Sequence, residues 1–354
     1  MLEALVDAVT RAGHSPVILG SRVVVVPAWG RVVGLFPDGR QNALWVNEPL
    51  FGADDSSWIN YGGDRVWISP ELDTNVADVG GGRLDVVVRK SVDPGSFQLT
   101  QADAGICEIV SRDSVSFRRA DSAVDLIRRR VVEVLSDAPH TASPHTASPH
   151  GVSPWAGVTS AGYRSTTTLT AEGSVPEKVR PAVWSILQVK PGSEITVPTL
   201  SHTPRTLAFI GAPRFDVAPR GSGGLLTCAV DASSSWKIGL HASDSLGLAM
   251  AEHDSPAGRV LVVRTSAVTP AERCSDVPGT LASDDPRAAG YVQQLYVDDG
   301  ALGGFGELEH HSPYLSSDNG YRVTDVCETF AYCGPADAVA AVRERWLASA
   351  RSRA

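Results

Sequence analysis

The sequence predicts an all-β fold: a large antiparallel sandwich of roughly 15 or more strands, flanked by short terminal helices. Short runs rich in β-branched and aromatic residues, broken by Gly, Pro, Asp and Ser, fill residues 21–121 and 165–332. Many short strands with frequent turn signals are typical of sandwiches and barrels. None of these runs leads into a long helical pattern, so the βαβ units of a parallel sheet are not expected. The patterns GxGxxG and GxxxxGK[ST] are absent, which argues against Rossmann and P-loop folds.

Helices are expected mainly near the two ends of the chain. Residues 1–13, MLEALVDAVTRAG, place apolar side chains at helical spacing before a glycine, which predicts a short amphipathic helix. Residues 335–354, PADAVAAVRERWLASARSRA, begin with a proline suited to a first helical turn and predict a closing helix. Residues 121–135, DSAVDLIRRRVVEVL, fit either a helix or a strand.

The β-rich pattern is interrupted by PHTASPHTASPHGVSP at residues 139–154. This repeat is rich in Pro and Ser and has no apolar periodicity, so it predicts a flexible insertion. Its histidines could bind a metal, but ordering the tract would cost entropy, and no carboxylate or cysteine joins them. We therefore expect residues 1–354 to form a single sandwich domain that carries this insertion.

Composition limits the class of partner. The 354 residues are 43% hydrophobic and carry a formal net charge of -9, which disfavours nucleic-acid and anionic-membrane partners. The N-terminus contains Glu3 and Asp7 and no basic leader, so no secretory signal is expected. VILGSRVVVV is too short to span a bilayer. The five cysteines form no CxxC, which favours reduced thiols in a cytoplasmic protein.

The first unusual motif is NYGGDRVWISPE, residues 60–71. Behind a Gly-Gly pair it gathers polar and aromatic candidates for a binding surface: Asn60, Asp64, Arg65, Trp67 and Glu71. An extended chain from residue 65 would put Arg65, Trp67 and Glu71 on one face. A tryptophan plane covers the apolar CH face of a sugar, and Arg and Glu bind its hydroxyls. The alternative is a surface ion pair between Arg65 and Glu71, with Trp67 as a half-buried lid.

The second unusual motif is GELEHHSPY, residues 306–314. On a strand, Glu307, Glu309 and His311 share one face, while Leu308 and His310 share the other. Two carboxylates and an imidazole crowded on one face shift each other's pKa values, as is common at acid–base or metal sites. The alternative is a solvated strand face with ordinary charges.

In order, the segments GRVVGLFPDGRQNALWVN, NYGGDRVWISPE, AVWSILQVKPG, SWKIGL and GELEHHSP resemble the galactose mutarotase-like superfamily over about residues 20–330. The resemblance implies a twisted antiparallel supersandwich that binds a small-molecule carbohydrate or glycoside in a groove on one sheet. Trp184 and Lys237, which lie in two of these segments, are expected to contact the sugar as well.

The resemblance also implies an acid–base mechanism. Aldose 1-epimerases use a glutamate as general base at the anomeric hydroxyl and a histidine as general acid at the ring oxygen. Glu309 best matches the base, with Glu307 as the alternative, and His202 and His311 are the candidates for the acid. The leading hypothesis is therefore an enzyme that acts on a sugar or sugar-like ring.

Two other functions stay open. Glu309 paired with Glu307 or Glu71 could cleave a glycoside as a hydrolase or lyase, and the separation of the carboxylates would distinguish the mechanisms. A non-catalytic carbohydrate-binding module would use the same groove. Metal chemistry would require Glu307, Glu309 and His311 to converge, with a fourth ligand from His202 or Glu71. Residues two apart on a strand point in parallel, so we predict no metal and no cofactor. The oligomeric state stays open.

Overall fold

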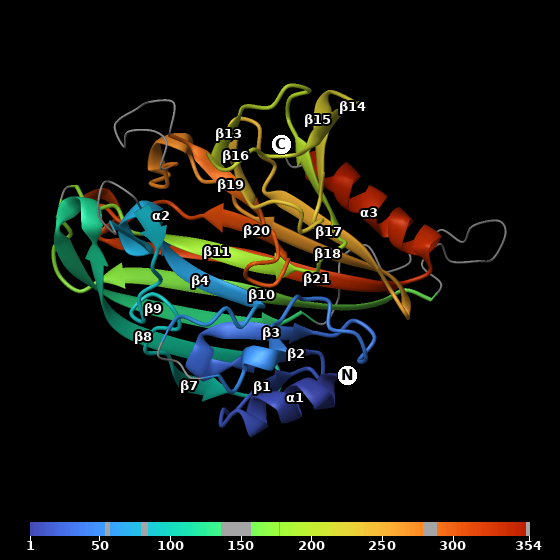
Figure 1. The fold of residues 1–354 in the computed structure, drawn as a ribbon, viewed down its shortest axis with the longest axis horizontal. Helices are drawn as coiled ribbons and strands as arrows, with labels where there is room; N and C mark the ends of the chain where they lie inside the picture. The colour runs from blue at the N-terminus through green and yellow to red at the C-terminus, as the bar shows by residue number, and fades with distance from the viewer. Residues whose placement is uncertain (54–56, 79–83, 136–156, 177, 279–288, 352–354) are drawn as a thin grey trace.

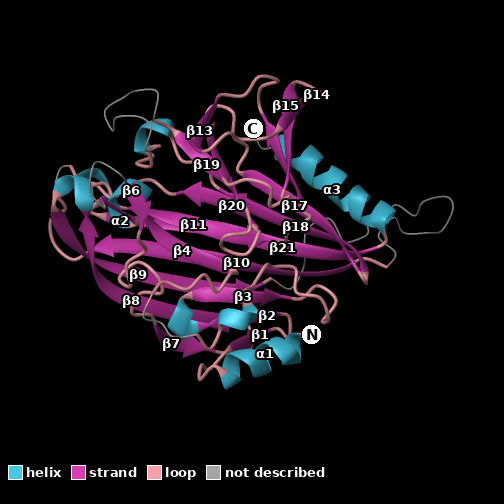
Figure 2. Cartoon of the chain, viewed as in Figure 1, coloured by secondary structure: helices cyan, strands magenta, loops and turns pink. Residues whose placement is uncertain are grey.

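The computed structural model describes residues 1–53, 57–78, 84–135, 157–176, 178–278 and 289–351. Two large antiparallel sheets face each other and the helices lie at the periphery (Figures 1 and 2). This arrangement confirms the predicted β-sandwich with short terminal helices. The insertion at 139–154 lies outside the described residues. In the described part of the chain, no helix is long and apolar enough to cross a membrane.

The first sheet has nine strands. Their spatial order is β1 (Val17–Leu19), β2 (Val23–Val26), β3 (Arg31–Leu35), β4 (Asp64–Ser69), β11 (Ala182–Val189), β20 (Gly306–His311), β19 (Tyr291–Val297), β16 (Trp236–His241) and β13 (Thr206–Ile210). Strands from both ends of the sequence therefore meet at its centre, where β4 and β20 flank β11.

The second sheet has ten strands. Their order is β14 (Asp216–Arg220), β15 (Gly223–Ala229), β12 (Glu194–Thr199), β17 (Leu248–Ser255), β18 (Gly258–Ser266), β21 (Arg322–Gly334), β10 (Thr159–Ala171), β9 (Ser122–Val134), β8 (Ile106–Phe117) and β7 (Gln98–Ala102). A small separate sheet pairs β5 (Val76–Asp78) with β6 (Leu84–Val86).

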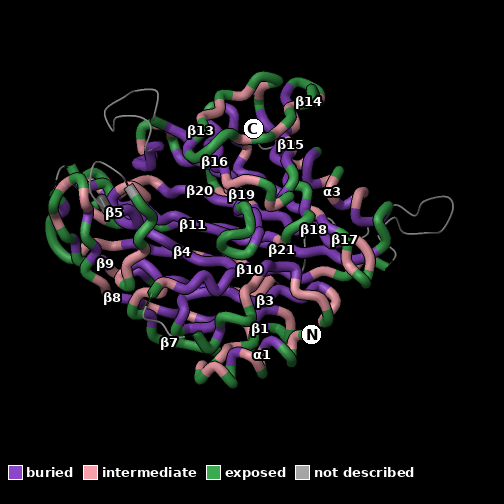
Figure 3. The backbone as a smooth tube through the Cα atoms, viewed as in Figure 1, coloured by how far each residue is buried: buried purple, intermediate pink, exposed green. Residues whose placement is uncertain are grey.

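The main core lies between the two large sheets, which is why their central strands are buried (Figure 3). Leu308 of β20 packs there with Val132 of β9 and Val262 of β18. Because side chains alternate along a strand, the neighbours of Leu308 point away from this core. We call that side of the first sheet its outer face.

The terminal helices cover sheet surfaces, as their amphipathic patterns predict. Leu5 and Val9 of α1 (Leu2–Arg11) pack with Val24 and Val33 on the outer face of the first sheet. The closing helix α3 (Ala336–Arg351) buries Trp346 against Phe330 of the second sheet. The described chain also contains the short helix α2 (Glu71–Thr74) and the 3-10 turns η1 (Pro27–Trp29), η2 (Glu48–Leu50), η3 (Arg118–Ala120), η4 (Ala271–Arg273) and η6 (Ser317–Asn319).

The ambiguous segment at 121–135 is a strand, β9, for most of its length. Its inward positions include Arg128 and Arg130, which are buried and paired with Asp113 and Asp64 respectively. The apolar alternation of a strand is therefore present only if these paired arginines are counted as core residues. All five cysteines of the chain are buried free thiols.

Candidate functional site

Strand register assembles a polar cluster on the outer face of the first sheet. On β11, Trp184 lies between Trp67 of β4 and His311 of β20. Two residues along, Ile186 lies between Arg65 and Glu309. Arg65 and Trp67 thus share one face of β4, Glu309 and His311 share one face of β20, and β11 lies between the two strands. On the far side of β20, Glu307 is opposite Tyr296 of β19, which is opposite Lys237 of β16.

These side chains surround a cavity of about 490 Å³, its open mouth included. It is lined by Trp58, Arg65, Trp67, Glu71, Val86, Trp184, Ile210, Lys237, Tyr296, Leu302, Phe305, Glu307 and Glu309. The floor carries charged groups and tryptophans, whereas Val86, Ile210 and Leu302 are exposed aliphatic residues. A mostly apolar wall with a few convergent polar groups is typical of a small-molecule site. We call it the Glu309 cavity.

Glu309 is the most perturbed carboxyl group in this cavity. Its Oε2 accepts a hydrogen bond from Trp184 Nε1 at 2.7 Å and lies 3.0 Å from Lys237 Nζ. Its Oε1 has no hydrogen-bond partner among the described residues. Burial, together with the nearby Glu307 and Glu71, outweighs Lys237 and raises the pKa of Glu309 to about 8. A carboxylate of this basicity is suited to proton transfer near neutral pH.

Lys237 is the cation that faces Glu309. Its Nζ lies 3.2 Å from Glu71 Oε2 and 4.2 Å from the centre of the Trp184 ring. Burial by itself lowers the pKa of Lys237, but Glu309 and Glu71 outweigh burial and raise it. Lys237 therefore stays an ammonium ion, held between two carboxylates and an aromatic face.

Glu307 has a separate set of partners. Its Oε1 accepts from Arg65 Nη2 at 2.9 Å and from Gln188 Nε2 at 2.8 Å. The Arg65 guanidinium also donates to Asn60 Oδ1 at 3.2 Å and lies 4.3 Å from the centre of the Trp67 ring. Asn60, Arg65 and Trp67 thus form one connected wall with Glu307, and the surface pair of Arg65 with Glu71 is not formed.

Neither His202 nor His311, the two candidate acids, is among the described residues that line the Glu309 cavity. His311 is fully buried and stacks on Trp184 at 5.5 Å between ring centres. Burial, Lys237 and His310 hold the pKa of His311 well below its ordinary value, so it is neutral. His202 is exposed in the loop after β12, where its Nε2 pairs with the carbonyl of Gly221 at 3.0 Å.

Two residues of the first motif lie elsewhere than their spacing suggested. Glu71 begins α2 instead of extending the strand, yet its side chain still reaches Lys237 in the cavity. Asp64 points inward, where its carboxylate accepts from Arg130, Arg264 and the hydroxyl of Tyr163 at 2.6–3.0 Å. The structure therefore places Asp64 in the interior between the sheets and away from the cavity.

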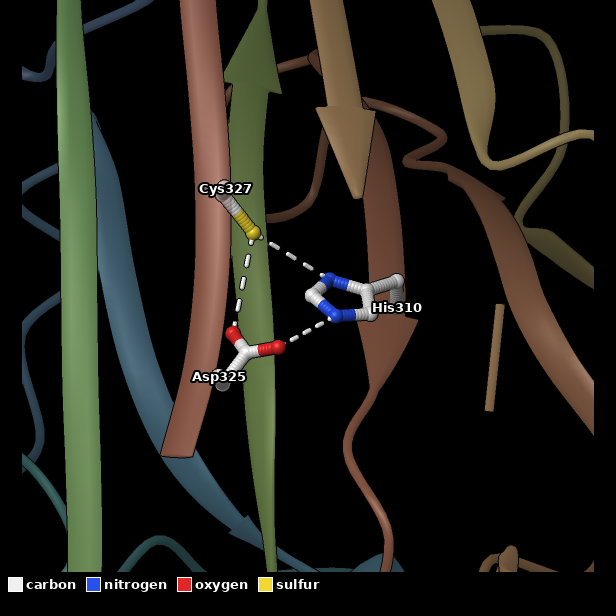
Figure 4. Close-up of side chains that lie close together, drawn as sticks. All are labelled: His310, Asp325 and Cys327. Carbon is white, nitrogen blue, oxygen red and sulfur yellow. Dashed lines mark hydrogen bonds and ion pairs between the residues drawn. The ribbon is translucent and has the colours of Figure 1, made fainter. Parts of the chain in front are cut away.

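A third polar cluster lies between the sheets, where His310, the residue after Glu309 on β20, faces Asp325 and Cys327 of β21 (Figure 4). His310 Nε2 is 2.6 Å from Asp325 Oδ1, and His310 Nδ1 is 3.3 Å from Cys327 Sγ. One ligand atom from each of the three lies within 4.8 Å of the others, close enough for a metal ion. Ser185 also donates to Asp325. The three side chains of this buried cluster therefore hydrogen-bond to one another.

Sequence reasoning missed several residues of the cavity wall. Trp58 lies before the first motif, in a loop, and meets Trp67 edge-on at 5.7 Å. Tyr296 reaches the site only because β19 lies between β20 and β16. Phe305 stands between the glycine pair Gly303-Gly304 and the second motif. This position next to the motif was the one sequence feature that could have marked Phe305 as a cavity residue.

Comparisons with known proteins identify the fold. No protein-family model matches the chain and no curated protein matches its sequence. A galactose mutarotase-like protein from Lactobacillus casei ATCC 334 aligns over 87% of this chain and 96% of its own, with a TM-score of 0.50 and 10% identity. A candidate aldose 1-epimerase from Escherichia coli K12 covers 89% of this chain and 97% of its own, with a TM-score of 0.47 and 12% identity. The chain therefore has the galactose mutarotase-like fold that its sequence resembles.

Proposed function

We propose that the protein acts on a sugar or sugar-like ring by acid–base chemistry in the Glu309 cavity, with Glu309 as the general base. One observation carries the proposal. Two donors fix Oε2 of Glu309, while Oε1 has no partner among the described residues. A buried acceptor without a partner is costly, and a ligand hydroxyl would satisfy it. The raised pKa of Glu309 suits it to take that proton.

The walls of the cavity support a ring-shaped ligand with hydroxyl groups. Trp67 and Trp184 meet edge-on at 5.2 Å, and together with Trp58 they give an aromatic surface for the CH face of a sugar. Arg65 and Lys237 add fixed cations that can bind hydroxyl oxygens or a carboxylate of the ligand.

Lys237 is the proposed partner of Glu309, because the two histidines lie outside the cavity. With a free aldose, Glu309 takes the proton of the anomeric hydroxyl, the bond between C1 and the ring oxygen breaks, and C1 becomes a carbonyl. The Lys237 ammonium donates a hydrogen bond to the ring oxygen and stabilises the negative charge that develops there. Rotation about the bond to C1 and reversal of these steps give the other anomer and restore both residues.

Glycoside cleavage fits the geometry less well. A hydrolase needs two carboxyl groups that flank the scissile bond. Here Glu71 and Glu309 contact the same Lys237 ammonium at 3.2 and 3.0 Å, and Glu307 is neutralised by Arg65 at 2.9 Å. The second candidate function is a non-catalytic sugar-binding module, which the absence of a histidine from the described cavity wall favours.

Anomer exchange measured by NMR on a panel of free aldoses tests the proposal. We expect wild-type protein to accelerate exchange of at least one aldose and Glu309→Gln to lose about 10²–10⁴-fold of that rate. His202→Ala, a change at the surface outside the cavity, is the matched control and should be unaffected. A folded Glu309→Gln variant with full turnover would remove the base assignment. Sugar binding without any turnover would instead support the binding module.

A further inference from the structure

A second cavity lies beside the first on the same face of the sheet. It has a volume of about 1030 Å³, its open mouth included. Its wall includes Trp29, Phe51, Trp58, Tyr61, Lys90 and Asp93. Trp29, Phe51 and Tyr61 belong to the cluster that packs on the outer face of β2 and β3, next to β4. We call it the Trp29 cavity.

Trp58 is the shared wall of the two cavities, since it lines both. On one side its ring meets Trp67 of the Glu309 cavity at 5.7 Å. On the other side its Nε1 donates to Asp93 Oδ2 at 2.6 Å, and Asp93 is held in turn by buried Arg31. The half-buried indole is thus fixed in orientation and not left as a loose surface group.

The Trp29 cavity also combines aromatic and charged groups, but its carboxyl group is perturbed in the opposite direction from Glu309: burial by itself raises the pKa of Asp93, and Arg31 and Arg65 outweigh burial and lower it. Trp29 and Tyr61 stack at 4.1 Å and form an apolar floor with Phe51. Lys90 and Asp93 bring charged groups to the wall. Aromatic surface with a few polar groups is what a second sugar ring requires.

We propose that the substrate is an oligosaccharide and that the two cavities are consecutive subsites. The reducing-end ring lies against Glu309, and the next ring lies past Trp58 in the Trp29 cavity. This inference rests on the proposed function, because it assigns the reacting ring to the Glu309 cavity. It adds the substrate class: a chain of at least two rings, in which the second ring binds but does not react.

The test compares sugars of different length on the full-length protein. Calorimetry uses glucose, galactose, mannose and xylose beside cellotriose, maltotriose, galactotriose, mannotriose and xylotriose. Ala28→Arg is the diagnostic variant, because exposed Ala28 lines the Trp29 cavity and not the Glu309 cavity. Ala218→Arg, at an exposed position of β14 in the second sheet, is the matched control.

We expect at least one trisaccharide to bind about tenfold or more tightly than its own monosaccharide. Ala28→Arg should remove that advantage and leave monosaccharide affinity unchanged, and Ala218→Arg should change neither. Trisaccharides that bind no better than monosaccharides, or an advantage that survives Ala28→Arg, would overturn the subsite proposal while monosaccharide turnover still supported the proposed function. If no sugar of any length binds, both proposals fall.

Discussion

Lys237 Nζ lies 3.0 Å from Glu309 Oε2, and this contact joins β16 to β20 across the intervening strand β19. The pair is buried, so each charge depends on the other for stabilisation. Burial raises the pKa of Glu309 to about 8 even with Lys237 in contact. The proposed base, Glu309, and the cation Lys237 are thereby held side by side in the cavity.

The first prediction is a rising pH profile. Glu309 can act as a base only when it is deprotonated, so the rate of anomer exchange should increase with pH and level off above about 8. The measurement is kcat/KM from pH 5 to 10, which reports the free enzyme. In Glu309→Gln the residual rate should not show this step. A wild-type rate that is constant from pH 5 upward would contradict the assignment.

The second prediction concerns Lys237. In the wild type, the Lys237 cation lowers the pKa of Glu309. Replacing Lys237 by Met removes that cation, so the pKa of Glu309 should rise. The pH profile of Lys237→Met should therefore shift to higher pH, and kcat should fall by about 10²–10³-fold because the cation no longer serves the ring oxygen. Lys237→Arg keeps the charge and is the matched control. A lower rate with an unshifted profile in Lys237→Met would indicate a structural role alone.

Local alternation in the sequence predicts which residues share a strand face. It placed Arg65 with Trp67 and Glu309 with Glu307, since a strand repeats every two residues. The same rule puts Asp64 on the opposite face from Arg65, and the structure finds it there. Grouping Asp64 with the cavity residues by closeness in sequence ignored this alternation. Pro70 ends the strand, so the rule does not extend to Glu71.

Pairings between distant segments are what the sequence could not supply. Lys237 and Glu309 meet only through the order of three strands, and Trp58 meets Trp67 through a loop. Arg128 and Arg130 obscured β9 because a buried arginine is acceptable only when a distant carboxylate pairs with it. In the same way, the burial of His311 behind Trp184 depends on the neighbouring strand and not on its own motif.

The third prediction is that Asp64 stabilises the fold. Arg130 and Arg264 both pair with its buried carboxylate, at 2.8 and 3.0 Å. Asp64→Ala leaves two buried cations uncompensated and should cost about 3–5 kcal/mol in free energy of unfolding. Denaturant unfolding measures this loss. Asp254→Ala removes an exposed pair with Arg259 and should cost less than about 1 kcal/mol. Equal losses in the two variants would contradict the prediction.

Low pH should destabilise the fold by protonating Asp64. Burial by itself raises the pKa of Asp64, but Arg264 and Arg130 outweigh burial and lower it below 3.8. A depressed carboxyl pKa gives stability that is present above the unfolded value and is lost as pH falls. The stability of the wild type should therefore decline below about pH 4, and Asp64→Asn should show a smaller part of that decline.

The last prediction concerns the cluster of His310, Asp325 and Cys327 between the sheets. Burial by itself lowers the pKa of His310, but Asp325 and Cys327 outweigh burial and raise it to about 10. A raised histidine pKa gives stability that is complete below the unfolded value of 6.5 and is lost as pH rises through the folded value. The wild type should therefore lose stability between about pH 7 and 10, on the order of a few kcal/mol.

The variant His310→Gln keeps a hydrogen-bonding side chain but cannot carry the charge. It should be less stable at neutral pH and lose less stability on the way to pH 10. His202→Gln makes the same substitution at an exposed histidine and is the matched control, so its loss of stability between pH 7 and 10 should equal that of the wild type. Thermal unfolding across pH 6–10 measures the slopes, and NMR titration of the His310 ring measures the pKa directly. If wild type and His310→Gln lose stability in parallel, His310 is not protonated in the folded protein at neutral pH, and its contact with Asp325 is a neutral hydrogen bond.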